Sequence, residues 1–235
     1  MLINAIILSN TKTVKYHDMV NRCIDTMISS TPNHTFKVFL FESNHEAKAN
    51  GWTFNQPEVE TIVPDEAFNF NRFYNLGLEK CTAEYVLLLN NDLIFEEGSV
   101  DKMVEAFAID PELWSVSPWE PKTHKTHKAS ANLIYGYTII RYICGWALMV
   151  KKDLFNIIGP YDERFVFWYQ DNDYSENLKK HGIKHALVRD AVVHHLGSVS
   201  HKTIPKGQAW DFKQGLRQLF IDKWKTKKDE SKSLF

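Results

Sequence analysis

The chain has 235 residues, of which 44% are hydrophobic and 24% charged, and its formal net charge is -1. This length and composition are those of one large globular domain, or of two tightly joined halves, with enough apolar residues for a sizeable core. A net charge near zero excludes a strong overall attraction to nucleic acid or to an anionic membrane. Any such partner would have to meet a local basic patch.

The three cysteines, Cys23, Cys81 and Cys144, are widely spaced and lie in apolar surroundings. This pattern predicts buried thiols in a reducing compartment rather than a disulfide framework or a zinc site. The apolar start, Met1–Leu8, lacks the basic flank and the small-residue cleavage site of a signal peptide, and no segment approaches membrane-spanning length. We therefore expect a cytoplasmic protein.

The first hundred residues alternate between strand-like and helix-like patterns. Apolar runs that stop at polar residues predict strands over residues 2–8, 36–41, 59–63 and 85–89. Apolar residues at helical spacing predict helices over residues 16–30 and 70–81, and Ser99 is expected to cap a third helix. This alternation predicts an α/β fold with a doubly wound, mostly parallel sheet.

The second half has a less regular pattern. A short strand is expected over residues 115–119, and the segment Pro121–Lys128, with three lysines and two histidines, is expected to be a basic loop. The remaining expected elements are a strand over 142–150, a short helix ended by Gly159-Pro160, a polar helix over 171–181 with Gly182 as its cap, and short strands over 185–188 and 191–193.

An amphipathic helix is expected near the C-terminus, from residue 207 to about 227, with basic and aromatic side chains. Two interpretations are open: the helix packs on the domain as a closing element, which we favour, or it lies on a membrane surface as a peripheral contact. We divide the single compact domain into residues 1–98, 99–205 and 206–235. The sequence does not indicate an oligomeric state.

A polar triplet, Asn90-Asn91-Asp92, ends the apolar run that begins at Tyr85. Ligands of open α/β sheets collect at the carboxyl ends of the strands. A carboxylate flanked by two amides at that position suits a divalent cation and a sugar or ribose hydroxyl. The alternative is a strand that simply stops at an Asn/Asp turn.

Two further polar sets follow. The aromatic segment Phe167–Asp173 opens into Asp171 and Asp173 at a helix start, where the helix dipole also favours carboxylates as caps. The apolar segment Asp190–Gly197 presents two adjacent histidines, and a histidine after a strand is often a hydrogen-bonded core residue. With Asp92, one imidazole makes half of a coordination shell for Mn²⁺ or Mg²⁺, and a diphosphate and water would complete it.

Several segments, in order along the chain, are similar to the motifs of one enzyme family. They are Asn69–Gly77, similar to an NFSRARNLG-like segment; Tyr85–Asp92, at the place of a DxD-type metal motif in an NND form; Gly145–Val150 and Gly159–Phe165, similar to acceptor-side segments; Gln170–Asp173, at the place of an E-D-x-D motif; and Val193–Ser198, similar to a V-Y-H-x-G-S segment. From about residue 2 to residue 200 the chain resembles a family 2 glycosyltransferase with the GT-A fold and a small acceptor-side subdomain.

The resemblance implies an inverting, metal-dependent enzyme that uses a nucleotide-sugar donor, most simply a UDP-sugar. It implies that Asp92 and His195 bind the metal, with His194 as the alternative ligand, and that Asp171 is the general base. The implied donor-binding residues are Ser9, Glu42, Arg72, Asn75, Asn90 and Asn91, with Glu42 on the uracil or ribose. The implied acceptor-binding residues are Trp146, Trp168 and Gln170, although both tryptophans also suit the core.

The sequence is compatible with two classes of acceptor. A glycan or glycolipid hydroxyl is the first expectation, and a viral enzyme acting on hydroxymethylated DNA bases is the alternative, because the basic segment Pro121–Lys128 suits an anionic partner as well as it suits a solvated loop. Asn90 and Gln170 stand where the family has acids, which would favour a non-catalytic nucleotide- or glycan-binding module. An oxidoreductase is excluded because Ser9-Asn10-Thr11 gives no glycine-rich phosphate turn after the first strand.

Overall fold

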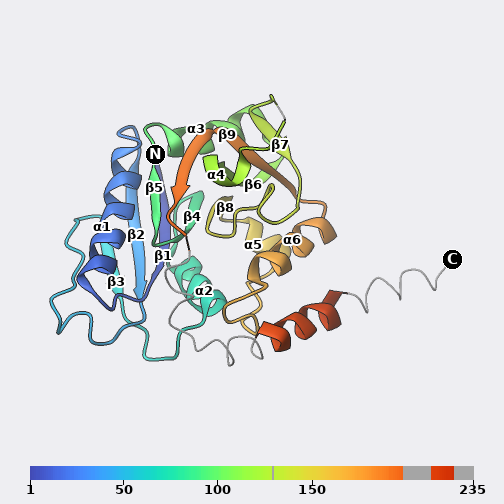
Figure 1. Cartoon of the computed structure of the whole chain (residues 1–235). Coiled ribbons are helices and arrows are strands. Elements are labelled where there is room, and N and C mark those ends of the chain that lie inside the picture. Colours follow the sequence, from blue (N-terminus) through green and yellow to red (C-terminus); the bar gives the residue numbers. More distant parts are fainter. Residues whose placement is uncertain (129, 198–212, 225–235) are drawn as a thin grey trace.

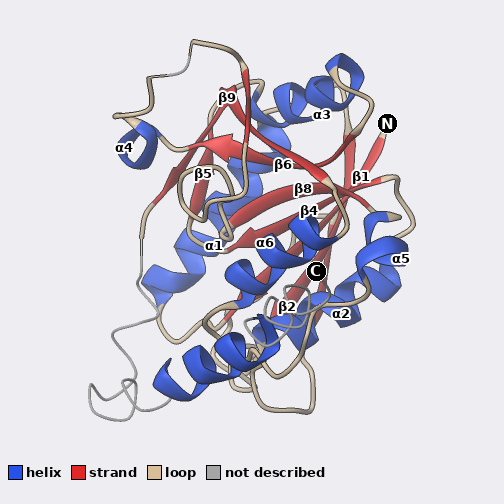
Figure 2. Cartoon of the chain, turned by 90° about the vertical axis from the view of Figure 1, so that its right-hand side faces the viewer, coloured by secondary structure: helices blue, strands red, loops and turns tan. Residues whose placement is uncertain are grey.

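The computed structural model describes residues 1–128, 130–197 and 213–224 (Figure 1). Within them, one sheet has the strand order β3-β2-β1-β4-β8-β6-β9-β5, and β7 pairs with β9 outside this path. The pairing directions leave β5, β7 and β8 running against the other strands. The sheet is therefore mostly parallel and has helices on both faces (Figures 1 and 2), which confirms the predicted fold class.

The first part of the chain forms the regular part of the sheet, where four neighbouring strands are parallel. Its elements are β1 (Leu2–Ser9), α1 (Val14–Ser29), β2 (Thr35–Glu42), β3 (Val59–Ile62), α2 (Phe70–Lys80) and β4 (Tyr85–Asn90). Each was predicted to within two residues at either end. The apolar runs of β1 and β4 are buried on both faces because helices cover both sides of these strands.

The second part continues the sheet with strands of both directions. Its elements are β5 (Leu93–Phe95), α3 (Ser99–Ile109), β6 (Leu113–Trp119), α4 (Pro121–His124), β7 (Leu133–Tyr135), β8 (Ala147–Lys151), α5 (Leu154–Ile158), α6 (Gln170–Lys180) and β9 (Lys184–His195). β8 lies antiparallel between β4 and β6 and so joins the two parts. The start of β8 therefore lies beside the end of β4.

The structure corrects several predicted elements. β9 is one continuous strand from Lys184 to His195 rather than two. β6 pairs with it from Lys184 to Val192, β7 pairs with Ala186–Val188 within that stretch, and β5 pairs with its last three residues. The strand expected over 142–150 begins only at Ala147, after a turn in which Ile140 has a φ of 70°. The basic loop contains the single-turn helix α4, which the side chain of Glu120 caps at Thr123.

The prediction for Ser99 is also wrong. Gly98, with a φ of 75°, is the residue before α3, and Ser99 is the first helical residue. The Ser99 hydroxyl instead donates to the carbonyl oxygens of Glu96 and Val192, 2.5 and 2.6 Å away. The serine thus connects the start of α3 to β9 rather than satisfying a helical N–H group.

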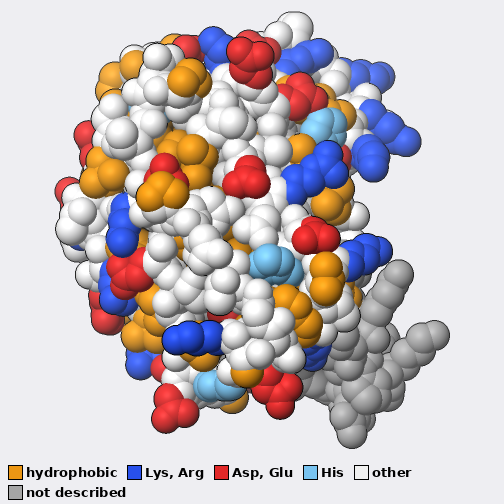
Figure 3. Space-filling model, turned by 90° about the vertical axis from the view of Figure 1, so that its left-hand side faces the viewer, with side chains coloured by type: hydrophobic (Ala, Val, Ile, Leu, Met, Phe, Trp, Pro, Cys, Tyr) orange, Lys and Arg blue, Asp and Glu red, His pale blue; other side chains and the backbone are white. Residues whose placement is uncertain are grey.

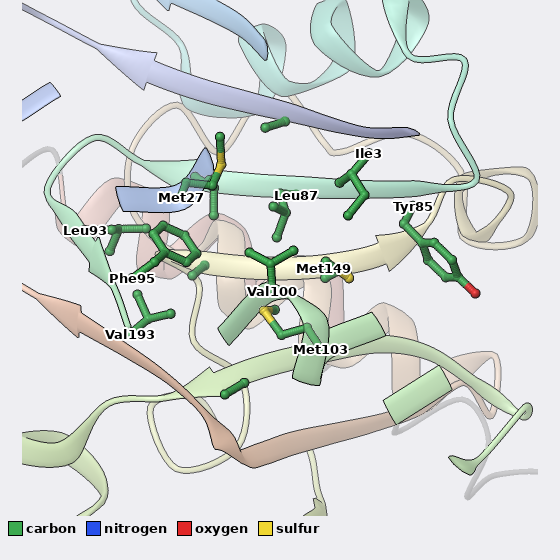
Figure 4. Packing of buried hydrophobic residues seen from close by; sticks show 14 of the residues in the cluster. Ile3, Met27, Tyr85, Leu87, Leu93, Phe95, Val100, Met103, Met149 and Val193 are labelled. Carbon is green, nitrogen blue, oxygen red and sulfur yellow. The ribbon is translucent and has the colours of Figure 1, made fainter. Parts of the chain in front are cut away.

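Two apolar layers enclose the sheet. On one face, residues of β1, β4 and β8 pack against α1 and α3, as in the cluster of Leu87, Val100, Met103 and Met149 (Figure 4). On the other face, the sheet packs against α2, α5 and α6. The three cysteine thiols are free and buried, as predicted, and burial raises the pKa of Cys23 to about 12. Among the described residues, no helix has the length and apolar character needed to cross a membrane.

Candidate active site

The parallel strands bring three predicted residues to one edge of the sheet. In the register of the sheet, Ser9 lies opposite Glu42 and the neighbouring Leu8 lies opposite Asn90, so the ends of β1, β2 and β4 are level. The Ser9 hydroxyl is 3.1 Å from the Thr11 hydroxyl. The Asn91 side-chain amide donates to the Ser9 hydroxyl over 3.4 Å. This edge is the carboxyl end of the strands, where the α/β architecture places its ligands.

Glu42 leaves one acceptor unused at this edge. Its Oε1 accepts the backbone N–H groups of Thr11 and Asn44, at 3.0 and 2.8 Å. Its Oε2 is buried and has no hydrogen-bond partner among the described residues. A buried acceptor without a donor costs free energy unless a ligand supplies one, so this oxygen suits a hydroxyl or ring N–H of a bound nucleoside.

Asp92 and His195 are brought together by the pairing of β5 with β9. Leu93 lies opposite His195 in this pairing, and the N–H group of Leu196 donates to the Asp92 carbonyl over 2.9 Å. Asp92 Oδ1 then lies 3.2 Å from His195 Nε2. The adjacent His194 turns away and contacts Glu96, with 2.6 Å between Nε2 and Oε1. Of the two histidines, His195 is therefore the one beside Asp92.

The same pair fits a divalent cation. Asp92 Oδ1 is buried without a hydrogen bond to any described residue, although His195 Nε2 is within ion-pair distance. Because Asp92 Oδ1 and His195 Nε2 lie close together without a hydrogen bond between them, both could coordinate one metal ion. Imidazole nitrogen and carboxylate oxygen together suit Mn²⁺. The described residues contain no cluster of three or more histidine, cysteine or acidic side chains, so a bound ligand would have to complete the shell.

Trp146 links the strand edge to the helix α6. Its ring stacks on His195, with 5.0 Å between centroids and 18° between planes, and its carbonyl accepts the Asn90 N–H group over 2.9 Å. The preceding residue, Gly145, lies against Asp171: a Cβ atom on Gly145 would be only 2.7 Å from the Cβ of Asp171. Asp92, His195 and Trp146 are thus in contact in series, and Gly145, the chain neighbour of Trp146, contacts Asp171.

Asp171 lies in the first turn of α6, close to the backbone N–H groups of the helix start. Its Oδ1 accepts the N–H group of Asn172 over 2.8 Å. Burial raises the pKa of Asp171 above its ordinary value, and the hydrogen bond from Asn172 opposes that rise in part. The neighbouring Gln170 has a buried Oε1 without a partner in the described structure. A carboxylate with a raised pKa is a stronger base than an ordinary aspartate, so Asp171 is suited to taking a proton from a bound hydroxyl.

Two predicted donor-binding residues have other contacts. Asn75 accepts the N–H group of Tyr161 and donates to the carbonyl of Tyr161 and to Glu163, each at 2.9 Å. Arg72 lies 3.4 Å from both Glu66 and Glu163. Both side chains thus connect α2 to neighbouring loops, and the contacts of the strand edge do not include them. Their role in donor binding stays a prediction.

Trp168, the second predicted acceptor residue, precedes α6. It packs edge-to-face on Phe167, with centroids 5.0 Å apart, and the ammonium group of Lys213 lies 5.9 Å from its ring. The sequence reasoning did not single out Thr11, Asn44 or Tyr169 as parts of the site. Thr11 and Asn44 hold Glu42 through backbone N–H groups, which any residue type could supply, and Tyr169 has a positive φ that its residue type does not indicate.

Comparison with known proteins shows the fold. No family model and no curated protein sequence matches the chain. Among solved structures, the chain is similar to GalNAc-T7 with UDP, GalNAc and Mn²⁺, at 11% identity and a TM-score of 0.69, over 86% of this chain and 44% of the other. It is also similar to the mannosyltransferase PcManGT from Pyrobaculum calidifontis with GDP-Man and Mn²⁺, at 14% identity and a TM-score of 0.63, over 84% of this chain and 57% of the other.

The chain thus spans about half the length of these two structures. Identities of 11 and 14% show a shared fold and nothing finer, so the fold is that of GT-A glycosyltransferases. The narrower resemblance to family 2 remains a prediction.

Proposed function

We propose that the protein is an inverting glycosyltransferase that moves a sugar from a nucleotide-sugar donor, most simply a UDP-sugar, to an acceptor hydroxyl. The observation that carries this proposal is the series of contacts from Asp92 and His195 through Trp146 to Asp171. It supports the proposal because neighbouring residues connect a candidate diphosphate-binding pair to a candidate base. The two similar structures, one with UDP, GalNAc and Mn²⁺ and the other with GDP-Man and Mn²⁺, support the donor class.

In this proposal each described group has one task. Glu42 Oε2 accepts from the nucleoside, and Ser9, Asn90 and Asn91 contact the nucleotide-sugar. Asp171 takes the proton of the acceptor hydroxyl while that oxygen bonds to the anomeric carbon. The bond from the anomeric carbon to the diphosphate oxygen breaks on the opposite side, so the nucleotide leaves with both bonding electrons and the configuration inverts.

The cation site belongs to the same proposal. Asp92 and His195 would hold Mn²⁺ or Mg²⁺, whose charge offsets the negative charge that develops on the departing diphosphate. Asn90 adds no charge to this site, so the donor diphosphate would supply much of the coordination. Trp146 and Trp168 offer aromatic faces to an acceptor sugar, and Gln170 Oε1 offers it an acceptor for a hydroxyl proton.

The test is a donor screen followed by a turnover assay. The thermal unfolding of the protein with Mn²⁺ would be measured with UDP-, GDP-, dTDP- and CMP-sugars, and nucleotide release would then be followed with the stabilising donor. We expect one nucleotide class to raise the Tm and to be turned over by the wild type but not by Asp171→Ala. Binding without turnover in either protein would instead support the non-catalytic module.

The acceptor is proposed to be a glycan or glycolipid hydroxyl. A hydroxymethylated DNA base is the second candidate, and unpaired basic side chains favour it: among the described residues Lys122, Lys125, Lys128 and Arg141 form no ion pair. Figure 3 shows lysine and arginine side chains gathered along one upper edge of the face that it draws, whereas charges of both signs are mixed elsewhere. Binding of a DNA acceptor would weaken steeply with salt, and transfer to a neutral glycan would not.

A further inference from the structure

The C-terminal helix over residues 213–224 packs on the part of the chain that carries the candidate base (Figures 1 and 2). Trp224 Nε1 donates to Asp173 Oδ1 over 2.7 Å, and the ammonium group of Lys223 lies 2.7 Å from the same oxygen. The Phe220 ring stacks on that of Tyr169, with 5.6 Å between centroids and 27° between planes. Tyr169 and Asp173 lie two residues before and two residues after Asp171.

The backbone at Tyr169 needs such support. Its φ of 67° and ψ of 3° place it in the left-handed region at the N-cap of α6, and its side chain makes no capping hydrogen bond. A non-glycine residue is less stable there than in the right-handed region, so surrounding contacts must hold it. This turn sets the direction in which Gln170 and Asp171 leave the chain.

The ionic contact at Asp173 is also buried. The Asp173 side chain is 2% exposed and that of Lys223 is 19% exposed. Burial raises the pKa of Asp173, and the hydrogen bond from Lys223 opposes the rise. Lys223 also lies 2.8 Å from Asp162 Oδ2, so one ammonium group joins the loop before α6 to its first turn. Removing the Lys223 ammonium group would leave the buried Asp173 carboxylate without its positive partner, which costs free energy.

We propose that the helix over 213–224 is a positioning element for the reaction, and that Tyr169 and Asp173 transmit its contacts to Asp171. Phe220 stacks on Tyr169 in the left-handed turn before α6, and Lys223 and Trp224 bond to Asp173 in the first turn of α6. Gly145 also borders Asp171, where a Cβ atom on Gly145 would lie 2.7 Å from the Cβ of Asp171. The helix acts through Asp171 and touches neither donor nor acceptor in this account. The inference rests on the proposed function.

The test compares substitutions on one helix in the full-length protein. Phe220→Ala removes the stack, Trp224→Phe removes the N–H donor and keeps the ring, and Phe220→Tyr restores a stacking partner. Arg217→Ala is the matched control, because Arg217 is exposed on the same helix. We expect Phe220→Ala to lower kcat roughly 10- to 100-fold, the scale of a small misplacement of a reacting group, while the KM for the donor stays within about twofold.

Two further readouts separate positioning from general stability. In Phe220→Ala, Asp171 should be less buried, so its pKa should fall and the acid limb of the kcat/KM profile should move to lower pH. Phe220→Tyr should restore both the position of the acid limb and kcat. Backbone hydrogen exchange at Asn172 and Asp173, measured without donor, should be faster in Phe220→Ala and Trp224→Phe than in Arg217→Ala. Unchanged exchange at these two amides would overturn the positioning role even if sugar transfer is confirmed.

The exchange measurement also keeps this inference distinct from the proposed function. A wild-type protein that turns over no donor would refute the transferase proposal, yet the exchange rates would still report whether the helix holds the first turn of α6. A kcat loss accompanied by an equal rise in the KM for the donor would contradict the positioning role, since the helix would then act on the whole site.

Discussion

The strand edge and the first turn of α6 carry the two halves of the proposed chemistry, and they are built in different ways. At the strand edge, Ser9, Glu42 and Asn90 are level because three parallel strands share one register. At α6, Asp171 is held by Gly145 from another segment and by a left-handed turn at Tyr169. The first arrangement follows from local sequence, and the second depends on packing between distant parts of the chain.

This difference predicts how each half should respond to substitution. A change at the strand edge should alter binding of the donor, because the register of the sheet stays intact and only one side-chain atom is lost. A change around α6 should alter turnover, because the donor still binds but the base is displaced. The following substitutions test that division.

The largest effect is expected for Asp171→Asn. The amide cannot take a proton, so turnover should fall by at least ~100-fold, the usual scale for loss of a general base. Nucleotide release measures turnover, and calorimetric titration with the unreactive nucleotide measures donor-side affinity, which should be unchanged. Equal losses in both measurements would mean that Asp171 belongs to the donor site instead.

Asp92→Ala should have the opposite profile. Loss of the carboxylate should weaken nucleotide affinity in the presence of Mn²⁺ by at least ~10-fold, because Asp92 is a proposed metal ligand. His195→Ala should do the same, and His194→Ala is its matched control because His194 contacts Glu96 instead. Titration with Mn²⁺ at fixed nucleotide distinguishes the three variants. A stronger effect of His194→Ala than of His195→Ala would assign the ligand to the other histidine.

A single methyl group should test the contact between the two halves. In Gly145→Ala the new Cβ would lie 2.7 Å from the Cβ of Asp171, too close for ordinary packing, so Asp171 must shift. We expect roughly a tenfold loss of turnover with nucleotide affinity retained. Gly215→Ala is the control, since a Cβ there would meet nothing within 4 Å. Full activity of Gly145→Ala would show that Asp171 tolerates displacement.

The pH profile offers a milder perturbation of the same carboxylate. Burial raises the pKa of Asp171 above its ordinary value of 3.8. A general base is active when ionised, so kcat/KM should be constant above the raised pKa and should fall as the pH is lowered through it. The wild-type acid limb should therefore lie above that of an ordinary aspartate. A limb at or below pH 3.8 would contradict either the burial or the role of Asp171.

The same division explains which parts of the fold the sequence predicts. The strands β1, β2 and β4 are apolar runs that end at polar residues, so both the elements and the alignment of their ends follow from the pattern. The parallel order then brings Asn90 and Ser9 to one edge. Asp92 could be placed near them for the same reason, because it follows β4 directly.

Other features of the fold depend on contacts between residues far apart in the chain, which a local sequence pattern does not indicate. β5 has three residues and exists because it pairs with the end of β9. β9 continues across Arg189-Asp190 because β6 pairs with it on both sides of these two residues. The left-handed turn at Tyr169 has no glycine or asparagine to signal it. The contact of Asp92 with His195 was implied by family resemblance, and only the pairing of β5 with β9 explains it physically.

The smallest effect on donor binding is expected for Asn75→Ala, although the resemblance implies that Asn75 contacts the nucleotide. Its amide makes hydrogen bonds to Tyr161 and Glu163, and its exposed fraction is only 8%. Removing it leaves buried backbone groups of Tyr161 unpaired, which should lower the free energy of unfolding by about 1–3 kcal/mol. Chemical denaturation measures that loss, and nucleotide titration of the folded variant measures affinity. A stable variant with weakened nucleotide binding would return Asn75 to the donor site, and would show that α2 as well as the strand edge contacts the nucleotide.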